Sequence, residues 1–228
     1  MRLKSLAIIP DGNRRFAAKN GLAVRKAYAR GFEKVQEVLN WTEGTGIEEV
    51  SFWALSLENY GKRSSAELRV LFSFISKYID KALQRGEFKN KGIAVRFFGK
   101  LDLLPESLRE KMRGLEAETS AGTRAMSVGL AYSGREELLQ AAKRVAVDFS
   151  GKDASGITES DFERYLYVRT APDLIIRTGD VSRLSGFMPW QTAYSELYFC
   201  SRLWPEFREE DFKDALKFYE STERRFGK

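Results

Sequence analysis

The chain has 228 residues, 43% of them hydrophobic, and without a composition shift to divide it we expect one domain over residues 1–228. The net charge of +6 favours anionic partners, and the absence of a dense Lys/Arg tract favours small phosphates over nucleic acid. The absence of histidine and the single cysteine, Cys200, exclude Ser-His triads, His-liganded zinc, imidazole catalysis and an internal disulfide.

Short apolar runs typical of buried strands recur along the chain. They predict six strands, at residues 6–10, 50–55, 93–98, 126–131, 174–176 and 197–199. Apolar residues at three- and four-residue spacing predict helices at 14–20, 27–43, 64–84, 106–118, 135–148, 159–166 and 209–225. This alternation indicates an α/β fold in which helices flank both faces of a mainly parallel, six-stranded sheet.

A glycine turn with fixed positive charge follows the first strand. In parallel sheets ligands bind beyond the carboxyl ends of the strands, so the turn Asp11-Gly12-Asn13 lies where function is expected. The amides of Gly12, Asn13 and Arg14 could face a phosphate, while Arg15 would supply charge. The alternative is an aspartate that caps the next helix, and this segment alone does not choose between them.

A polar segment also follows the second predicted strand. It runs from Ser56 to Arg63 and leads into a long helix with an apolar stripe. The stripe favours core packing, because almost every helix of such a fold has one, and a wall for a long hydrocarbon is the alternative. The stripe consists of Leu68, Leu71, Phe72, Ile75 and Ile79.

The segment after the fifth strand repeats the pattern of the first. Arg177 and Arg183 flank a turn whose hydroxyls, on Thr178, Ser182 and Ser185, could donate to an oxyanion. Two such segments indicate two phosphorylated substrates. Farther along, Glu196 precedes the last strand, where it is either a surface charge or a ligand for the hard cation that neutralises a diphosphate.

Several motifs occur in an order that resembles the cis-prenyltransferases, in particular the bacterial undecaprenyl diphosphate synthases. The resemblance runs nearly end to end. It rests on Ile8 to Asn13, Ser56 to Asn59, Pro172 to Gly179, Trp190 to Phe199, Leu203-Trp204-Pro205 and Arg224 to Gly227.

The resemblance implies a homodimeric, Mg2+-dependent enzyme with a hydrophobic tunnel. Such an enzyme condenses isopentenyl diphosphate repeatedly onto farnesyl diphosphate in cis, and its C55 product is the lipid carrier for cell-wall glycans. It implies that Asp11 is catalytic and handles metal and diphosphate, that Glu196 binds metal, and that Asn59 accepts or relays the proton. The remaining substrate-binding residues implied are Gly12, Asn13, Arg14, Arg15, Phe16, Arg25, Tyr28, Ser56, Leu57, Glu58, Tyr60, Lys62, Arg63, Arg177, Arg183, Leu184 and Ser185.

The chain departs from the family pattern mainly near the expected diphosphates. Asp180-Val181 replaces Gly-Glu, Tyr28 lies near the family's histidine, and Phe16 replaces a tryptophan. Arg14 replaces a glycine. Two family arginines have two candidates each, Val24 or Arg25 for one and Lys62 or Arg63 for the other. We therefore expect activity with altered substrate affinity or metal dependence.

The resemblance leaves three further expectations. An amide is a poor base, so pyrophosphate, or a water oriented by Ser56 and Asn59, would accept the proton. With no apolar run of about 20 residues, we expect a cytoplasmic protein, with a peripheral position at the inner membrane left open and transient membrane contact for product release. The alternatives are a non-catalytic or partner-dependent subunit with the same fold and a basic nucleic-acid-binding module.

Overall fold

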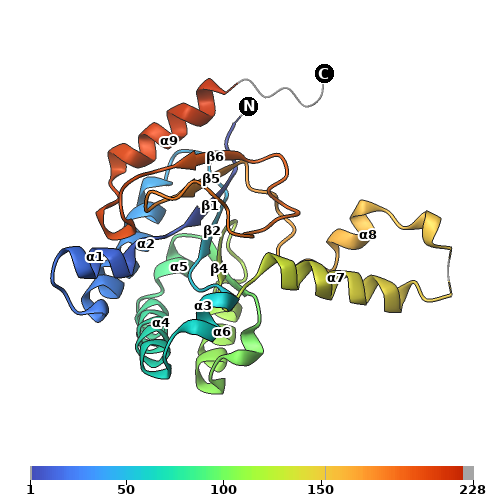
Figure 1. The fold of residues 1–228 in the computed structure, drawn as a ribbon, viewed down its shortest axis with the longest axis horizontal. Helices are drawn as coiled ribbons and strands as arrows, with labels where there is room; N and C mark the ends of the chain where they lie inside the picture. The colour runs from blue at the N-terminus through green and yellow to red at the C-terminus, as the bar shows by residue number, and fades with distance from the viewer. Residues whose placement is uncertain (1, 152, 223–228) are drawn as a thin grey trace.

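Six parallel strands form one sheet at the centre of the molecule (Figure 1). The computed structural model describes residues 2–151 and 153–222. Along the sheet the strands follow the order β3-β4-β2-β1-β5-β6, and each predicted strand is confirmed. Their bounds are β1 Ser5–Ile9, β2 Glu49–Trp53, β3 Ile93–Phe98, β4 Arg124–Gly129, β5 Leu174–Arg177 and β6 Glu196–Phe199.

The helices lie between the strands as the apolar spacing predicts. Their bounds are α1 Asn13–Lys19, α2 Val24–Trp41, α3 Leu57–Lys62, α4 Ser65–Arg85, α5 Glu87–Asn90, α6 Glu106–Thr119, α7 Gly134–Asp148, α8 Glu159–Glu163 and α9 Glu209–Ser221. The short helices α3 and α5 were not predicted, because one or two turns carry too little apolar periodicity. Helix α9 ends at Ser221, before the predicted 225; residues 223–225 lie outside the described part of the chain.

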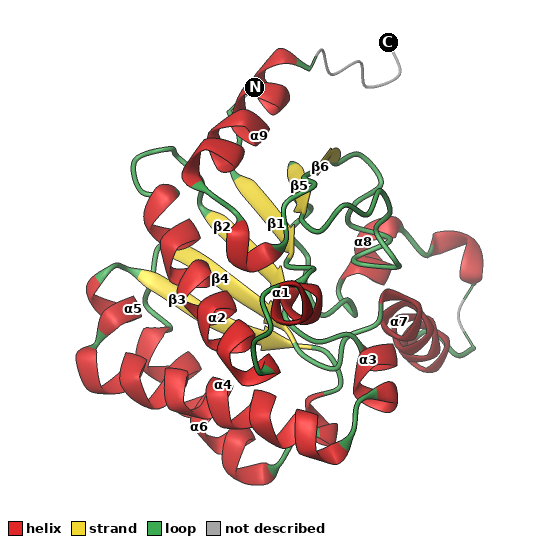
Figure 2. Cartoon of the chain, turned by 60° about the vertical axis from the view of Figure 1, so that its left-hand side comes forward, coloured by secondary structure: helices red, strands yellow, loops and turns green. Residues whose placement is uncertain are grey.

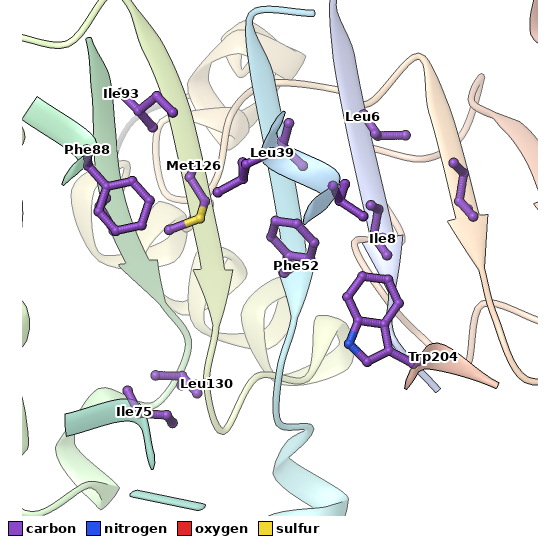
Figure 3. Close-up of a cluster of buried hydrophobic side chains, with 14 of the residues drawn as sticks. Leu6, Ile8, Leu39, Phe52, Ile75, Phe88, Ile93, Met126, Leu130 and Trp204 are labelled. Atoms are coloured by element: carbon purple, nitrogen blue, oxygen red, sulfur yellow. The ribbon is translucent and has the colours of Figure 1, made fainter. Parts of the chain in front are cut away.

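Helices lie on both faces of the sheet (Figure 2), and the two faces carry different cores. Side chains alternate along each strand, so Leu6 and Ile8 of β1 face one side while Ala7 and Ile9 face the other. Helices α2, α4, α6 and α9 cover the first side and fill it with aliphatic and aromatic groups. Figure 3 shows part of this core, with Leu39 of α2 and Ile75 of α4 among the labelled side chains. The second side holds a smaller, mainly aromatic cluster, beside which α7 and α8 extend outward.

The apolar stripe of α4 belongs to the larger core. Leu71, Ile75 and Ile79 are buried within it, while Leu68 and Phe72 are partly buried against it. The core-packing interpretation of this stripe is confirmed, and the hydrophobic tunnel remains a prediction. Among the described residues, no helix is both long and apolar enough to cross a bilayer.

Candidate active site

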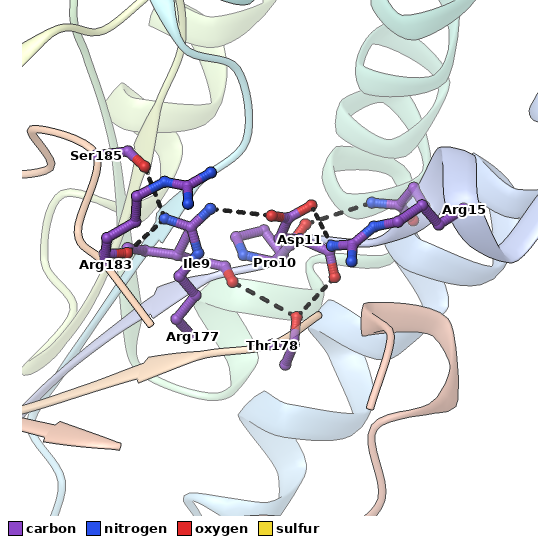
Figure 4. A network of polar contacts seen from close by, with 9 residues as sticks. Ile9, Pro10, Asp11, Arg15, Arg177, Thr178, Arg183 and Ser185 are labelled. Carbon is purple, nitrogen blue, oxygen red and sulfur yellow. Dashed lines mark hydrogen bonds and ion pairs between the residues drawn. The ribbon is translucent and has the colours of Figure 1, made fainter. Parts of the chain in front are cut away.

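The side chain of Arg177 joins the two glycine segments at the carboxyl ends of β1 and β5 (Figure 4). These strands are neighbours, and Ile9 pairs with Arg177. The Arg177 guanidinium is 7% exposed and lies 3.0 Å from the Asp11 carboxylate through Nη2. Its Nη1 donates to the Arg183 carbonyl at 2.5 Å and to the Ser185 hydroxyl at 2.9 Å. One arginine therefore brings Asp11, Arg183 and Ser185 into a single site.

The Asp11 side chain is partly exposed to solvent. It is 34% exposed, and its second oxygen lies 3.2 Å from Arg15 Nη2. The ion pair of Asp11 with Arg15 can be exchanged for a ligand, because Arg15 is exposed and exposed ion pairs contribute at most about 1 kcal/mol, whereas the Arg177 guanidinium is nearly buried. Neither this side chain nor any other caps α1: its N-cap is Gly12, and no side-chain cap hydrogen bond forms. The capping interpretation of Asp11 was therefore wrong.

Two close approaches fix the backbone around Asp11. Gly12 has φ 118°, and a Cβ there would lie 2.9 Å from Leu203. A Cβ on Gly179, which has φ 91°, would lie 2.9 Å from the Asp11 carbonyl oxygen and 2.5 Å from Arg15 Nη2. Only glycine combines these dihedral angles with this spacing, so both glycines are required by the geometry.

Thr178 has a structural part in the site, because its hydroxyl bonds to the main chain of Asp11 instead of facing a ligand. It is fully buried, and its hydroxyl donates to the Asp11 carbonyl at 2.9 Å. The Trp204 amide donates to the same carbonyl, also at 2.9 Å. The hypothesis that the Thr178 hydroxyl donates to an oxyanion was wrong, because the tight turn directs that hydroxyl to the main chain. Ser182 is exposed, and the Ser185 hydroxyl accepts from the Arg177 guanidinium.

A second group of charged residues gathers between α2 and the start of α4. The Arg63 guanidinium lies 5.7 Å from the ring of Tyr28 and 3.5 Å from Glu67. Its Nε and Nη1 are buried without a hydrogen-bond partner. Tyr28 donates to Glu67 at 2.9 Å, and burial raises the pKa of Tyr28 to about 12, with Arg63 and Arg14 acting in the opposite direction.

Arg63 Nε is the atom nearest Glu67, so Nη1 is the nitrogen without a hydrogen bond or ion pair, and such a nitrogen at a partly enclosed position indicates a place for an anion. This favours Arg63 over Lys62, which is exposed, for the family position that the sequence left open. Glu67 was missed by the sequence reasoning. Its position four residues after Arg63 and three after the cap Ser64 was the available signal.

Helix α3 holds the predicted polar segment after β2. The Ser56 hydroxyl caps this helix by accepting from the Asn59 amide at 3.0 Å, and the Tyr60 hydroxyl donates to the Leu103 carbonyl at 2.9 Å. Leu57 is half-buried and packs on the larger core, whereas Glu58 is exposed. Ser56 is thus primarily a structural cap, and the structure leaves the roles of Asn59 and Glu58 as predictions.

The other predicted residues differ in exposure and in position. Arg14 and Arg183 are exposed, Asn13 and Phe16 are partly buried, and Leu184 packs beside the aromatic core. Arg25 lies at a groove of about 440 Å³ on the outer surface, with Arg69 and Lys77 of α4. Arg25 thus lies beside α4 and, among the described residues, forms no hydrogen bond or ion pair with Asp11.

Glu196 lies at the other end of the sheet from Asp11. It is the first residue of β6, level with Leu174 and, one strand farther, with Leu6. Asp11 is five residues beyond Leu6, or roughly 16 Å along the strand direction. One chain therefore does not bring these two carboxylates to the same ion, and the described residues contain no cluster of three or more potential ligands.

The donor set around Asp11 nevertheless fits a magnesium ion bound mainly through substrate. Mg2+ is commonly held by one or two carboxylates together with phosphate oxygens and water. Asp11 offers one exposed carboxylate beside arginines that suit a diphosphate. Residues in this chain could thus supply one protein ligand to a magnesium–diphosphate complex.

The chain matches the family model described as "Putative undecaprenyl diphosphate synthase" over residues 9–227. It is 41% identical to a geranylgeranyl-diphosphate-specific tritrans,polycis-undecaprenyl-diphosphate synthase of Picrophilus torridus, over 97% of this chain and 89% of the relative. It is 37% identical to an isoprenyl transferase of Thermus thermophilus, over 99% of this chain and 89% of the relative.

Among solved structures, the fold is similar to that of lavandulyl diphosphate synthase from Lavandula x intermedia, crystallised with dimethylallyl diphosphate. The TM-score is 0.91 at 30% identity, and the similarity covers 100% of this chain and 99% of the other. The likeness thus includes the sheet order and the helices that position the site.

Proposed function

The chain belongs to the cis-prenyltransferase family, whose members condense isopentenyl diphosphate with an allylic diphosphate, and we propose that its product is a long-chain polyprenyl diphosphate, undecaprenyl (C55) diphosphate. The observation that carries the assignment of the site is the contact of Arg177 with Asp11 and Ser185. This contact joins the segment after β1 to the segment after β5, more than 160 residues away in sequence. A reaction between two diphosphates requires two such binding segments side by side.

Two sets of cations would hold the two diphosphates. Arg15, Arg14 and Arg63 lie toward α1 and α4 and suit the allylic diphosphate. Arg177, Arg183 and Ser185 lie over β5 and suit isopentenyl diphosphate. Asp11 stands between the two sets. This arrangement allows the two substrates to be bound at once with their reacting ends facing each other.

The reaction breaks the allylic carbon–oxygen bond and releases pyrophosphate. The alkene of isopentenyl diphosphate supplies the electron pair of the new carbon–carbon bond, and loss of a proton forms the new double bond. Arginine N–H groups stabilise the charge that develops on the departing diphosphate. A bound magnesium ion would add Lewis-acid stabilisation of the same charge, with Asp11 as its protein ligand.

The proton acceptor is proposed to be pyrophosphate or a water near Asn59. The Ser56 hydroxyl accepts from the Asn59 amide in the cap of α3, so it holds Asn59 on the first turn of the helix. If Asn59→Ala kept near-normal turnover with intact substrate binding, this role for Asn59 would be wrong.

Two primers are candidates. The relatives from Picrophilus torridus and Thermoplasma volcanium, at 41% and 42% identity, are named as geranylgeranyl-diphosphate specific. These identities favour geranylgeranyl diphosphate over the farnesyl diphosphate that the motifs alone suggested. Farnesyl diphosphate, which the motif resemblance implies, remains the second candidate; the name of the 37% identical Thermus isoprenyl transferase states no primer.

The decisive experiment incubates the purified protein with Mg2+, labelled isopentenyl diphosphate and each primer in turn, and resolves the products by chain length. A C55 product from one primer supports the proposal, and the primer with the higher kcat/KM identifies the preference. A product that stops after one or two condensations would contradict the proposed chain length. Absence of elongation with every primer would favour the non-catalytic, partner-dependent subunit instead.

Homodimer formation is part of the proposal because Glu196 cannot reach the Asp11 of its own chain. A second copy could place its Glu196 near that site, which would keep the predicted metal role. Mixing an Asp11→Ala chain with a Glu196→Ala chain tests this, since a mixed dimer would recover one intact site. No recovery, in mixtures shown by mass to contain the mixed dimer, would exclude a shared site. Transient membrane contact during product release and a role in cell-wall lipid supply complete the proposal.

The departure at Asp180 is compatible with activity. Asp180 has φ 55°, in the left-handed region where the family's glycine is favoured and where Asp is among the better-tolerated substitutes. Its amide donates to the Cys200 carbonyl at 3.1 Å, which holds this turn against β6. The backbone of the turn is thus retained despite the changed side chain.

A further inference from the structure

A buried polar cluster that the proposed chemistry does not use lies under the loop that carries Ser185. We call it the Glu137 cluster, and it consists of Tyr132, Glu137, Tyr167 and Gln191. Glu137 is 1% exposed, and its carboxylate accepts from the Tyr132 hydroxyl at 2.7 Å and from the Tyr167 amide at 2.6 Å. The Gln191 side-chain nitrogen lies 3.4 Å from both carboxylate oxygens.

This cluster is bonded directly to the loop of residues 183–191. The Tyr132 hydroxyl, having donated to Glu137, accepts from the Met188 amide at 3.2 Å. Beside it, the Gly134 amide donates to the Gly186 carbonyl at 3.2 Å, and a Cβ on Gly134 would overlap that oxygen and Pro189. Tyr132 and the first residue of α7, Gly134, therefore lie in close contact with the loop at Gly186, Met188 and Pro189.

Aromatic packing holds the same loop from the other side. Phe187 is fully buried, stacks on Trp53 with a centroid separation of 5.0 Å and meets the edge of Tyr132 at 6.0 Å. Tyr132 thus contributes both a ring and a hydroxyl to the position of the loop.

The backbone of the loop needs this support. Ser185 and Met188 have φ 55° and 47°, values in the left-handed region that disfavours side chains other than those of Gly, Asn and Asp. Such conformations persist where the surrounding contacts over-determine them, and they concentrate at functional sites. Arg177 holds Ser185 at one end. At the other end Tyr132 holds Met188, while Glu137 and the Val168 carbonyl hold Gln191.

We infer that Tyr132 and Glu137 are positioning residues, which set the loop so that Arg183 and Ser185 face isopentenyl diphosphate without touching that substrate themselves. The inference rests on the proposed function, because it assumes that this loop binds isopentenyl diphosphate. A buried carboxylate with three donors is a costly group to retain for stability alone, since an apolar replacement of both partners can be nearly neutral. The hydrogen bonds between this cluster and the strained, ligand-facing loop explain why the buried carboxylate is retained.

Tyr132→Phe is the most selective test, because it keeps the ring and removes only the hydroxyl. The KM for isopentenyl diphosphate is expected to rise about tenfold, equivalent to losing one to two hydrogen bonds, while the primer KM and kcat stay within about twofold. Amide hydrogen exchange in residues 183–191 is expected to accelerate, with no change in β3 or α6. The matched control is Tyr165→Phe, which also loses a hydroxyl bond to a carboxylate, that of Asp148, outside this cluster.

An unchanged KM for isopentenyl diphosphate and unchanged exchange in the loop would overturn the inference, even if the Tm fell. If Tyr132→Phe folds poorly, Glu137→Gln is the second variant. It keeps the side-chain volume and one acceptor oxygen, but an NH2 donor replaces the other oxygen. It should show the same selective rise in KM. Wild-type protein that elongates no primer would contradict the proposed function, whereas an active wild type with an unaffected variant would contradict this inference alone.

Discussion

The two faces of the sheet are built on different principles. On the face covered by α2, α4, α6 and α9, contacts are almost entirely apolar, and Phe52 meets Trp204 ring to edge. On the opposite face a smaller aromatic cluster adjoins a buried carboxylate and a loop with left-handed residues. Apolar contacts are non-directional and tolerate repacking, whereas hydrogen bonds fix direction. The first face therefore supplies stability, and the second adds the precise placement of a loop.

The largest expected effects come from a matched pair of side-chain truncations, one in each core. Phe52 is 2% exposed and Phe187 is fully buried, so each change to alanine is expected to lower the free energy of unfolding by about 3–5 kcal/mol. Phe187→Ala should also raise the KM for isopentenyl diphosphate severalfold, because the ring supports the loop, whereas Phe52→Ala should leave it within about twofold. Urea unfolding and steady-state kinetics measure both quantities. Equal effects on KM would mean that the faces do not differ in this way.

The second prediction concerns the charged rim where both faces end. Asp11→Ala is expected to lower kcat by about 10²–10³-fold, the range for loss of a group that acts on developing charge. The free energy of unfolding should fall by about 1–3 kcal/mol, because the change leaves the nearly buried Arg177 guanidinium without its carboxylate partner. Asp214→Ala, which removes an exposed ion pair on α9, is the control and should keep full turnover. A substantially active Asp11→Ala enzyme would remove Asp11 from the reaction.

The third prediction separates two adjacent cations on the side of the larger core. Arg63→Gln is expected to raise the KM for the allylic primer about tenfold, because it removes a nearly buried guanidinium whose Nη1 has no partner in the protein. Lys62→Gln should change this KM by less than about twofold, since Lys62 is exposed. Initial rates at saturating isopentenyl diphosphate give both values. The reverse order would assign the primer diphosphate to Lys62.

The smallest expected effect is a pH dependence from the second face. Burial raises the pKa of the Glu137 carboxyl, and its hydrogen bonds with Tyr132, Tyr167 and Gln191 only partly oppose this. The folded protein thus keeps this proton at pH values where the unfolded chain has released it, so the stability from this group falls as pH rises through the folded pKa. Glu137→Gln removes the dependence. Its Tm deficit relative to wild type should be larger at pH 5 than at pH 8, by a few degrees at most; a deficit that grows with pH would contradict the assigned direction.

Much of the fold could be predicted because burial in a parallel sheet leaves a local signature. Each of the six strands is a short apolar run, and the longer helices show three- and four-residue spacing. Asp11, Arg177 and Ser185 could also be singled out, since residues after strand ends meet at one edge of such a sheet. The short helix α3 escaped prediction because its main signal is a single cap, Ser56.

The sequence alone indicates the strand–helix pattern, the glycine turns and the charged residues at the strand ends. The pairing of Arg177 with Asp11, the turning of Thr178 toward the main chain and the enclosure of Arg63 by Tyr28 were decided only in the tertiary structure. The Glu137 cluster was decided there too, as was the separation of Glu196 from Asp11. The physical reason is range: backbone preference and apolar periodicity act between neighbours in sequence. Hydrogen bonds of buried polar groups depend on which distant segments the strand order brings side by side.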